Sequence, residues 1–455
     1  MEAETLILGG GLAGISSSFH LGHKYCTIIE KNPHLGGHAY THYKDGAFWD
    51  EGPHVSFTKH EYIKQILAKS CSSDIINHQA VVGNYFQGNW IPHPAQCNLS
   101  CIPEPLARQC LDDFFAASRS KSSNKEPFNY QEWLDQSFGL AFSRNFPSAY
   151  TQKYWTCNPD QLTIDWVGSR VFRPNDKTIM EGYFGKPKAN DSYINSFRYP
   201  SRGGFASFIS GMSEGVCFVN DEVVSINLDD KKVRLLSGAV YKYNKLISSI
   251  PLDLFINLID SVPSNIKEAA SNLRCSSLLL VNLLGRQSIP NPNHWMYVYD
   301  KDLYSTRITQ THLLSPLNTP KPMAGIQVEV YESPYKAFQE SHGAISEKVK
   351  EEILKIGLLD QVLSIHCRYI KYANVIFDHN RRSALDSIFS FLERYGLVRE
   401  PYDLEAFYDW KDESKFQHQP NLMLAGRFGQ WNYFWSDDCI LRGRQIGDSR
   451  SRLRT

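Results

Sequence analysis

The first residues constrain this chain most. An apolar run of strand length, residues 4–8, leads directly into Gly9, Gly11 and Gly14, which are spaced G-x-G-x-x-G, and a helix-compatible stretch follows. In a strand–turn–helix unit that receives a pyrophosphate, the first glycine allows the tight turn and the second lets backbone N–H groups approach phosphate. The third lets helix and strand pack closely. The helix N-terminus adds the positive end of its dipole.

Three glycines after a strand can also be a plain turn, so the context decides the interpretation. A second apolar run, residues 25–29, ends at Glu30, about 20 residues after the first glycine, where an acid can accept hydrogen bonds from ribose hydroxyls. The two features together predict a dinucleotide-binding domain.

The turn after Glu30 favours FAD over NAD. Residues 32–38 contain Gly36 and Gly37 and form a second glycine turn directly after the ribose-binding acid. This pattern resembles the large FAD-binding group that contains amine oxidases, desaturases and sugar mutases. Taken alone, the same residues could be a surface turn.

Composition excludes several classes of partner. Lysine plus arginine (48) equals aspartate plus glutamate (48) in 455 residues, so no global field would draw the protein to nucleic acid or an anionic membrane. An anionic ligand must be captured by local arginines. We expect no membrane span and no cleaved signal, because no run of about 18 apolar residues exists and the chain starts with the cofactor strand.

Ten cysteines without a C-x-x-C pair predict a protein of the reducing cytoplasm, and Cys97 with Cys101 lacks the further ligands that a zinc site needs. The 24 tyrosines, 25 phenylalanines and 9 tryptophans suit a ring-lined ligand cleft, although most of them will be core residues.

The order of the patterns predicts an α/β fold. We expect a Rossmann-like FAD-binding domain with an inserted helical domain and a mixed antiparallel sheet domain. The expected boundaries are 1–90, 196–258 and 418–455 for the FAD-binding domain, 91–195 for a helical substrate-binding insertion, and 259–417 for the sheet domain.

Three stretches carry candidate site residues. His54 follows Gly52 and Pro53 in a tight turn directly after the cofactor module, so it is either a flavin contact or an ordinary surface or core histidine. Prolines on both sides of His93 fix the backbone there and would present His93 and Gln96 rigidly. The third stretch brings aromatic residues and two arginines together, as expected for a diphosphate and a base or for a plain surface and core: Tyr154, Trp155, Trp166, Arg170 and Arg173.

Three motif blocks resemble the UDP-galactopyranose mutase family, especially its fungal and protozoan branch. Residues 88–96 match Gly-x-x-Val/Ile-Pro-x-Pro-x-Gln, residues 197–204 match Phe-Arg-aromatic-Pro-x-Arg-Gly-Gly, and residues 426–433 match Gly-Arg-Phe-Gly-x-Trp-x-Tyr. The resemblance extends over nearly the whole chain as scattered blocks. It implies an FAD domain, a helical domain and a six-stranded sheet.

The resemblance also implies roles for individual residues. Arg170 and Arg307 match arginines that clamp the substrate diphosphate, Tyr372 and Tyr433 match tyrosines that donate to it, and His54 matches a histidine beside the flavin. The other implied substrate contacts are Gln96 and His93 near the uridine, Trp166, Asn195 and Trp295. The implied cofactor contacts are Gly9, Gly11, Leu12, Ala13, Gly14, Glu30, Lys31, Gly36, Gly37, His38, Val223, Gly426, Arg427, Tyr433 and Asp438.

Three positions depart from the family pattern. Pro53 stands where the family has a glycine, which restricts a redox-linked backbone flip. His93 replaces a tyrosine next to the uracil, and Asn195 is shifted by one place. These changes bear on the sugar and on redox control rather than on the diphosphate clamp.

The resemblance implies that the protein interconverts pyranose and furanose forms of a UDP-sugar through attack of reduced FAD N5 on the anomeric carbon. NADPH or NADH would be a possible reductant, and a homo-oligomer is possible. Two other functions stay open: an FAD-dependent oxidoreductase of the amine oxidase or desaturase type, and a flavin-containing binding protein without turnover.

Overall fold

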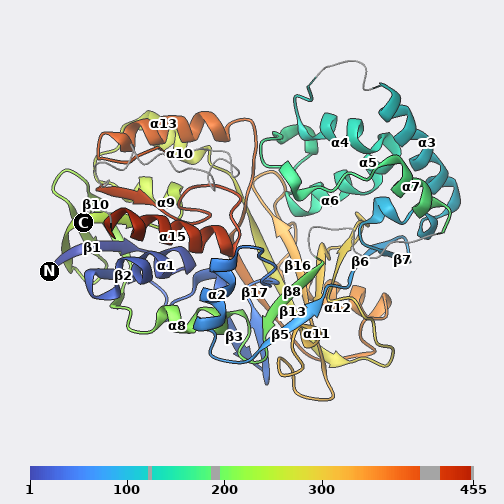
Figure 1. Ribbon diagram of the computed structural model, residues 1–455, viewed down its shortest axis with the longest axis horizontal. Coiled ribbons are helices and arrows are strands. Elements are labelled where there is room, and N and C mark those ends of the chain that lie inside the picture. The colour runs from blue at the N-terminus through green and yellow to red at the C-terminus, as the bar shows by residue number, and fades with distance from the viewer. Residues whose placement is uncertain (121–125, 186–194, 400–420, 452–455) are drawn as a thin grey trace.

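The computed structural model describes residues 1–120, 126–185, 195–399 and 421–451. Figure 1 shows three groups of elements: a sheet with helices on both faces beside the N-terminus, a second sheet in the middle, and a cluster of helices at the opposite end.

The first sheet is mainly parallel and is built from distant parts of the chain. Its strand order is β10-β11-β12-β1-β2-β9, with β18 paired to β12. The pairs among β1 (Glu2–Leu8), β2 (Cys26–Glu30), β9 (Phe218–Asn220), β12 (Val240–Ser248) and β18 (Leu422–Leu424) are parallel. An antiparallel edge is added by β10 (Val223–Asn227) and β11 (Lys232–Leu235).

Alternation along β1 explains the layers around this sheet. Ile7 is buried with residues of α1 (Leu12–Leu21) and α15 (Ser436–Ser451), whereas Leu6 and Leu8 are buried with residues of α9 (Leu252–Leu258), α10 (Ser264–Ser271) and α13 (Arg381–Glu393). Successive side chains of a strand point to opposite faces, so a central strand of a three-layer fold must be apolar on both. The layers confirm the predicted Rossmann-like α/β fold.

The second sheet is mixed and has the order β17-β13-β16-β15-β14-β6-β7. Its strands are β17 (Gln361–Val375), β13 (Cys275–Arg286), β16 (Ala324–Glu332), β15 (Arg307–Gln310), β14 (Trp295–Val298), β6 (Val82–Phe86) and β7 (Asn89–Pro92). One face, which includes Val281, Ile308 and Val328, is buried against α12 (His342–Lys355). On β15 and β16 the residues that alternate with these are polar, namely Arg307, Thr309, Gln327 and Glu329, so the strand pattern there separates a core face from a site face.

The helical cluster contains α3 (Glu104–Ser120), α4 (Tyr130–Phe138), α5 (Leu140–Asn145), α6 (Pro147–Tyr154) and α7 (Asp176–Tyr183). Asn129 and Asn175 begin α4 and α7 as N-caps, since their side chains accept from Glu132 N and Thr178 N. Smaller elements connect the three groups: β3 (Thr41–Lys44), β4 (Ala47–Asp50), α2 (Glu61–Ser70), β5 (Ile75–Gln79), β8 (Ser196–Pro200), α8 (Ser210–Ser213) and α11 (Thr311–Leu314).

The strand pairing departs from the expected division of the chain in two places. The strand β6 lies before residue 90, yet it joins the second sheet through parallel pairing with β14. The helices α10 and α13 lie between residues 259 and 417, yet they are buried with the first sheet.

The second sheet has seven strands in the described residues rather than six. Local periodicity identifies a strand or a helix but does not say which sheet it joins. The expected boundary at 417 and 418 lies outside the described residues.

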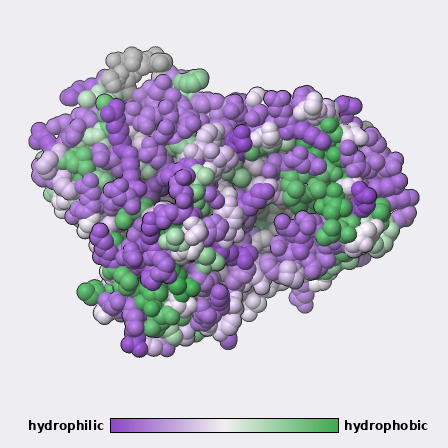
Figure 2. All heavy atoms as spheres, turned by 180° about the vertical axis from the view of Figure 1, so that it is seen from behind, coloured by the Kyte–Doolittle hydropathy of each residue, from purple (hydrophilic) through white to green (hydrophobic). Residues whose placement is uncertain are grey.

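No helix in the described part of the chain is long and apolar enough to cross a bilayer. The face shown in Figure 2 is largely hydrophilic, and its apolar side chains gather in separate patches.

Candidate active site

The glycines of the first turn form a cradle from three chain segments. A side chain at Gly37 would place its Cβ 2.9 Å from the Gly11 Cα, and one at Gly426 would lie 2.9 Å from the Ala13 Cβ. Gly14 packs so closely that an added Cβ would be 2.1 Å from the Gly9 carbonyl oxygen. These contacts allow only glycine, and they bring residues 9–14, 36–37 and 426 together.

The start of α1 suits an anionic ligand. The helix begins after Gly11, which has extended backbone and provides no side-chain cap, so no side chain competes for the N–H groups of the first turn. Leu12 and Ala13 are the first two residues of the helix, and both are buried. The arrangement fits the pyrophosphate of a dinucleotide such as FAD.

Glu30 is buried and already holds the glycine turn. Its carboxylate accepts from Gly10 N at 2.7 Å, from Asn32 N at 2.9 Å and from Asn32 Nδ2 at 2.7 Å. A carboxylate has about four acceptor sites, so one is left for a ribose hydroxyl. Lys31 lies beside it, and the Asn220 side chain donates to the Lys31 carbonyl at 3.0 Å. Val223 begins the adjacent strand β10.

Asp438 supports a bound group near the start of α15. One of its carboxylate oxygens accepts from Trp435 N at 2.6 Å, whereas the other, Oδ1, is buried without a hydrogen-bond partner among the described residues. Burial raises the pKa of Asp438 to about 7, against the opposing effects of the Trp435 N–H and the Arg170 charge. A buried orphan oxygen calls for a ligand or a proton, so this residue also fits a cofactor site.

Arg427 joins the cofactor side to the second sheet. Its Nε donates to the Phe434 carbonyl at 2.7 Å and its Nη1 to the Ala373 carbonyl at 3.2 Å. Ala373 lies where β17 bulges against β13, between the pairs Ser276–Asn374 and Leu278–Ile370. The bulge frees a carbonyl from the ladder, and Arg427 satisfies it.

A row of side chains crosses three strands of the second sheet. Tyr297 on β14 lies opposite Arg307 on β15, which lies opposite Glu329 on β16, and residues directly opposite each other share a face. Arg307 binds Glu329 in a bidentate pair, with Nε–Oε2 at 2.5 Å and Nη2–Oε1 at 2.7 Å. Burial would lower the pKa of Arg307, but the charge of Glu329 raises it well above its usual range, so the guanidinium stays charged.

Four further tyrosines lie around this row, and together with Tyr297 we call them the tyrosine group: Tyr150, Tyr154, Tyr297, Tyr331 and Tyr433. Tyr150 lies 5.6 Å from Tyr154 and 5.4 Å from Tyr297 between ring centroids, and Tyr154 lies 5.0 Å from Tyr331. The Tyr154 hydroxyl donates to Asn374 Oδ1 at 3.0 Å and lies 3.5 Å from the Tyr433 hydroxyl.

The electrostatics of the tyrosine group reflect burial. Burial raises the pKa of Tyr150 and Tyr154 well above the usual value, and the nearby charge of Arg307 opposes this. The side chains nevertheless keep partial exposure. The Tyr150 hydroxyl is buried and has no hydrogen-bond partner among the described residues.

Arg170 reaches the tyrosine group from the helical side. It ends the short 3-10 helix Gly168–Arg170, and its guanidinium carbon lies 4.8 Å from the Tyr433 ring centroid and 4.7 Å from that of Trp435. Its Nη2 donates to the Tyr433 carbonyl at 3.1 Å. Tyr433 therefore lies next to Arg170. It also lies next to Tyr154, whose pKa is influenced by the charge of Arg307.

His54 lies between the cofactor side and the second sheet. Its Nδ1 contacts the Gly52 carbonyl at 3.0 Å, and a side chain at Gly52 would place its Cβ 3.4 Å from Glu329 Oε1. Burial, with the charges of Arg427, His38 and Arg307, lowers the pKa of His54 to about 4. The imidazole is thus neutral at pH 7.

The residue before this turn, Glu51, is held by a separate cluster. It accepts from Arg368 Nε at 2.8 Å and contacts His42 Nε2 at 3.0 Å and His38 Nδ1 at 3.2 Å. Burial alone would raise the pKa of Glu51, but the hydrogen bonds of the two histidines and the Arg368 charge lower it well below its usual range. The cluster fixes the turn that carries His54 to β17.

Three more predicted residues lie around the tyrosine group, and a fourth, Gln96, contacts the segment that follows Arg170. The His93 ring is 5.1 Å from that of Tyr297, and burial lowers the pKa of His93 to about 4. Trp295 Nε1 donates to the Tyr297 hydroxyl at 3.3 Å. Trp166 is buried with its ring 6.1 Å from that of Tyr433, and Gln96 Nε2 donates to the carbonyl of Phe172, two residues after Arg170, at 2.7 Å.

Two predicted substrate residues engage other partners. The Tyr372 hydroxyl donates to Asp253 Oδ2 at 3.1 Å, and its ring lies 5.5 Å from that of Phe428. Asn195 is exposed, and its carbonyl accepts from Ala80 N at 3.0 Å. The structure does not bring either side chain to the tyrosine group.

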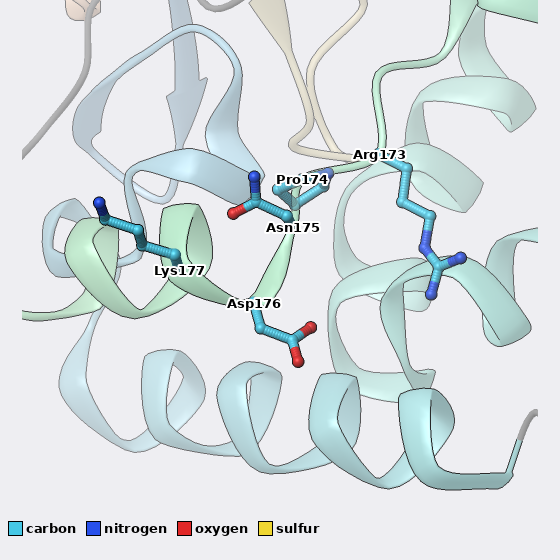
Figure 3. A pocket seen from close by; sticks show the side chains of 5 residues that line it. All are labelled: Arg173, Pro174, Asn175, Asp176 and Lys177. Atoms are coloured by element: carbon cyan, nitrogen blue, oxygen red, sulfur yellow. The ribbon is translucent and has the colours of Figure 1, made fainter.

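A hollow in the helical cluster lies apart from this site. It is lined by Arg173, Pro174, Asn175, Asp176 and Lys177. Figure 3 shows that the Arg173 and Lys177 side chains point in opposite directions rather than toward a shared centre. Arg173 Nε donates to the Ser137 carbonyl at 3.2 Å, so this arginine is a structural residue.

The candidate site includes residues that the sequence reasoning did not select: Tyr150, Tyr297, Tyr331 and Glu329. A signal was present for two of them. Tyr297 stands two residues after Trp295 and Glu329 two residues before Tyr331, the spacing that places side chains on one strand face. A carboxylate inside the apolar run of β16 also requires a charged partner.

Comparison with known families identifies the class of protein. Residues 12–289 match the flavin containing amine oxidoreductase family, so the chain belongs to that family. It is therefore a flavoprotein, and the glycine cradle is its expected FAD site.

Solved structures show which folds this chain resembles. A reduced UDP-galactopyranose mutase matches with a TM-score of 0.87 at 21% identity, covering 99% of this chain and 96% of the mutase. A putative protoporphyrinogen oxidase from Exiguobacterium sp. 255-15 matches with a TM-score of 0.73 at 16% identity, over 100% and 99% of the two chains. A putrescine oxidase bound to putrescine matches with a TM-score of 0.59 at 11% identity, over 100% of both. The chain thus has the complete fold of these proteins.

Proposed function

We propose that this protein is an FAD-dependent mutase that interconverts pyranose and furanose forms of a UDP-sugar, of the UDP-galactopyranose and UDP-galactofuranose type. The observation that carries the proposal is the tyrosine group with an arginine at each end. Arg170 contacts Tyr433, and Arg307 lies beside Tyr297 on the same sheet face. A diphosphate suits two guanidinium groups and several phenol donors.

The cofactor and the chain would divide the chemistry. Bound and reduced, the flavin would supply a nucleophilic nitrogen for the anomeric carbon. Arg170 and Arg307 would stabilise the charge of the departing diphosphate, and the tyrosine hydroxyls would hold it within reach until the sugar recloses through another hydroxyl. Neutral His54 would lie beside the flavin without adding charge.

The Glu329 carboxylate controls the charge and the orientation of the Arg307 side chain. It neutralises much of the arginine charge in the free protein and fixes the guanidinium plane through two hydrogen bonds. The bidentate pair uses Nε and Nη2, so among the described residues the Nη1 edge is left to meet an incoming anion. This pairing keeps Arg307 oriented before substrate binds.

The alternative is an FAD-dependent oxidoreductase of the amine oxidase or desaturase type. Family membership supports it, and the cofactor cradle serves both reactions equally. An amine substrate, however, would gain no hydrogen bond from Arg170 and Arg307, whereas a nucleotide diphosphate can accept from both guanidinium groups.

The decisive experiment uses the FAD-bound protein reduced anaerobically with dithionite and incubated with UDP-galactofuranose. We expect conversion to UDP-galactopyranose, followed by chromatography, with no electron acceptor consumed and with little conversion by the oxidised protein. Turnover that requires an acceptor, or an oxidised sugar product, would instead identify an oxidoreductase.

The cellular setting belongs to the same proposal. We expect a cytoplasmic enzyme that supplies furanose for cell-surface polysaccharide and whose flavin is reduced by NADPH or NADH. Loss of the flavin absorbance band on anaerobic addition of either nucleotide would identify the reductant.

A further inference from the structure

Lys153 is a buried lysine outside the tyrosine group. It lies on α6, between Tyr150 and Tyr154, and 5% of its surface is exposed. Its ammonium group donates to two backbone carbonyls, those of Asp300 and Ser305, at 2.7 Å each. A lysine so far from water is retained only where its hydrogen bonds are needed.

The two carbonyls lie in one loop, residues 299–306. This loop connects β14, which carries Tyr297, to β15, which begins with Arg307. The lysine thus ties the helix that carries two tyrosines to the loop that sets the position of the arginine.

The same loop is fixed from its other side by α12. Glu352 accepts from Tyr304 N at 2.7 Å, from Ser305 N at 3.0 Å and from Ser305 Oγ at 2.6 Å. Ser305 is therefore held by both side chains: its carbonyl accepts from Lys153, and its N–H and hydroxyl donate to Glu352. Through Ser305, polar contacts thus connect α6 to α12.

We propose that Lys153 is a positioning residue that locks α6 onto residues 299–306 and thereby fixes the tyrosines of α6 relative to Arg307. Its effect on substrate binding rests on the proposed function, whereas the lock itself does not.

Charge supports this assignment. Burial lowers the pKa of Lys153 to about 7, and the charge of Lys336 lowers it further. The carboxylates of Glu352, Asp300 and Asp302 oppose this shift. Below pH 7 the ammonium makes two charge-assisted hydrogen bonds to the loop, and above it the neutral amine makes two weaker ones. The lock therefore loosens as the pH rises through neutrality.

The lock is tested by hydrogen exchange on the FAD-bound protein. Lys153→Met keeps the length and removes the donors, Lys153→Arg restores a permanent charge, and Lys301→Met is the control for the loss of an exposed lysine on the same loop. We expect amides of residues 147–154 and 299–310 to exchange roughly tenfold faster in Lys153→Met only, since local opening becomes easier. Unchanged exchange would overturn the proposal.

Substrate binding is then tested with UDP-galactose, whose diphosphate has no terminal phosphate that titrates near neutrality. We expect Lys153→Met to raise the dissociation constant about tenfold, the effect of losing a charge-assisted contact. The dissociation constant of Lys153→Arg should stay close to that of the wild type. The wild-type dissociation constant should rise from pH 6 to pH 8.5 more than that of Lys153→Arg. Asp438 titrates in both proteins, so the difference isolates Lys153.

The two tests separate the two claims. Faster exchange in Lys153→Met without any UDP-galactose binding by the wild type would leave the lock standing and remove the proposed function. Binding by the wild type with unchanged affinity in Lys153→Met would remove Lys153 as a positioning residue, whereas identical pH profiles for wild type and Lys153→Arg would remove only the loosening of the lock with pH.

Discussion

Tyr150 and Tyr154 lie one helical turn apart on α6, yet their hydroxyls have different surroundings. The Tyr154 hydroxyl has a partner in Asn374, whereas the buried Tyr150 hydroxyl has none in the described part of the chain. An orphan hydroxyl in a candidate ligand site is a group that a ligand would use.

Phenylalanine at each position separates structure from binding. We expect Tyr154→Phe to lower the free energy of unfolding by about 1 kcal/mol, the value of a net hydrogen bond. Tyr150→Phe should change stability by less than about 0.5 kcal/mol but raise the dissociation constant of UDP-galactose about 3- to 10-fold. Denaturant unfolding and flavin-absorbance titration measure the two effects. Equal loss of stability in both variants would contradict the assignment of Tyr150.

His93 makes the stability depend on pH. Its pKa is lowered from the ordinary 6.5 to about 4, so the unfolded chain binds the proton more readily than the folded one. The stabilisation is complete above pH 6.5 and is lost as the pH falls toward 4.

Glutamine at position 93 removes this titration. Between pH 7 and pH 4.5 we expect the unfolding free energy of His93→Gln to fall by about 1 to 2 kcal/mol less than that of the wild type. His379→Gln, at an exposed histidine, is the control and should follow the wild type. Parallel curves for all three proteins would show that His93 is not buried as a neutral imidazole.

Among the elements, the contact of α1 with α15 matters most for the cofactor. Ser16 Oγ donates to the Ile440 carbonyl at 2.9 Å, and a Cβ at Gly443 would lie 2.5 Å from the Ser16 carbonyl carbon. The two helices thus approach each other through backbone. Their separation would move the N-terminus of α1 away from the glycine cradle.

Alanine at position 443 tests this helix pair. We expect Gly443→Ala to destabilise the protein by about 1 to 3 kcal/mol through overpacking and to weaken FAD retention. Gly343→Ala in α12 is the matched control, because its Cβ would meet only Ser341 Oγ at 4.0 Å. It should be neutral or stabilising by up to about 1 kcal/mol. Thermal unfolding and flavin content after gel filtration measure both changes, and equal behaviour of the two variants would contradict the account.

The cofactor half of the fold was predictable because its signals are local. Glycine spacing, the acid at Glu30 and the second glycine turn all lie within the first 38 residues, and each requires one backbone geometry. The sheet membership of β6 and the docking of α13 on the first sheet were not predictable, because these are long-range choices that local periodicity does not encode.

The same division applies to the candidate site. Arg170 and Arg307 were selected through motif resemblance, and the structure brings both to the tyrosine group. Glu329 and Tyr150 were missed because their roles arise from cross-strand pairing and helix docking. Tyr372 was selected through the same resemblance, but its hydroxyl donates to Asp253.

At the scale of the whole molecule, the site exists only where the three groups of elements meet. The cofactor sheet contributes the glycine cradle and His54, the second sheet contributes Arg307 and Tyr297, and the helical cluster contributes Arg170 and Tyr150. Arg427, Lys153 and Arg368 are the polar ties that hold these groups together.

The central claim is that this meeting point binds a nucleotide diphosphate next to the flavin. The most direct measurement is titration of the FAD-bound protein with UDP-galactose, followed by flavin absorbance. We predict a saturable spectral change whose dissociation constant rises roughly tenfold or more in Arg170→Ala and in Arg307→Ala, but not in Arg286→Ala at an exposed arginine of β13. No spectral response in the wild type, or unchanged affinity in both site variants, would contradict the account.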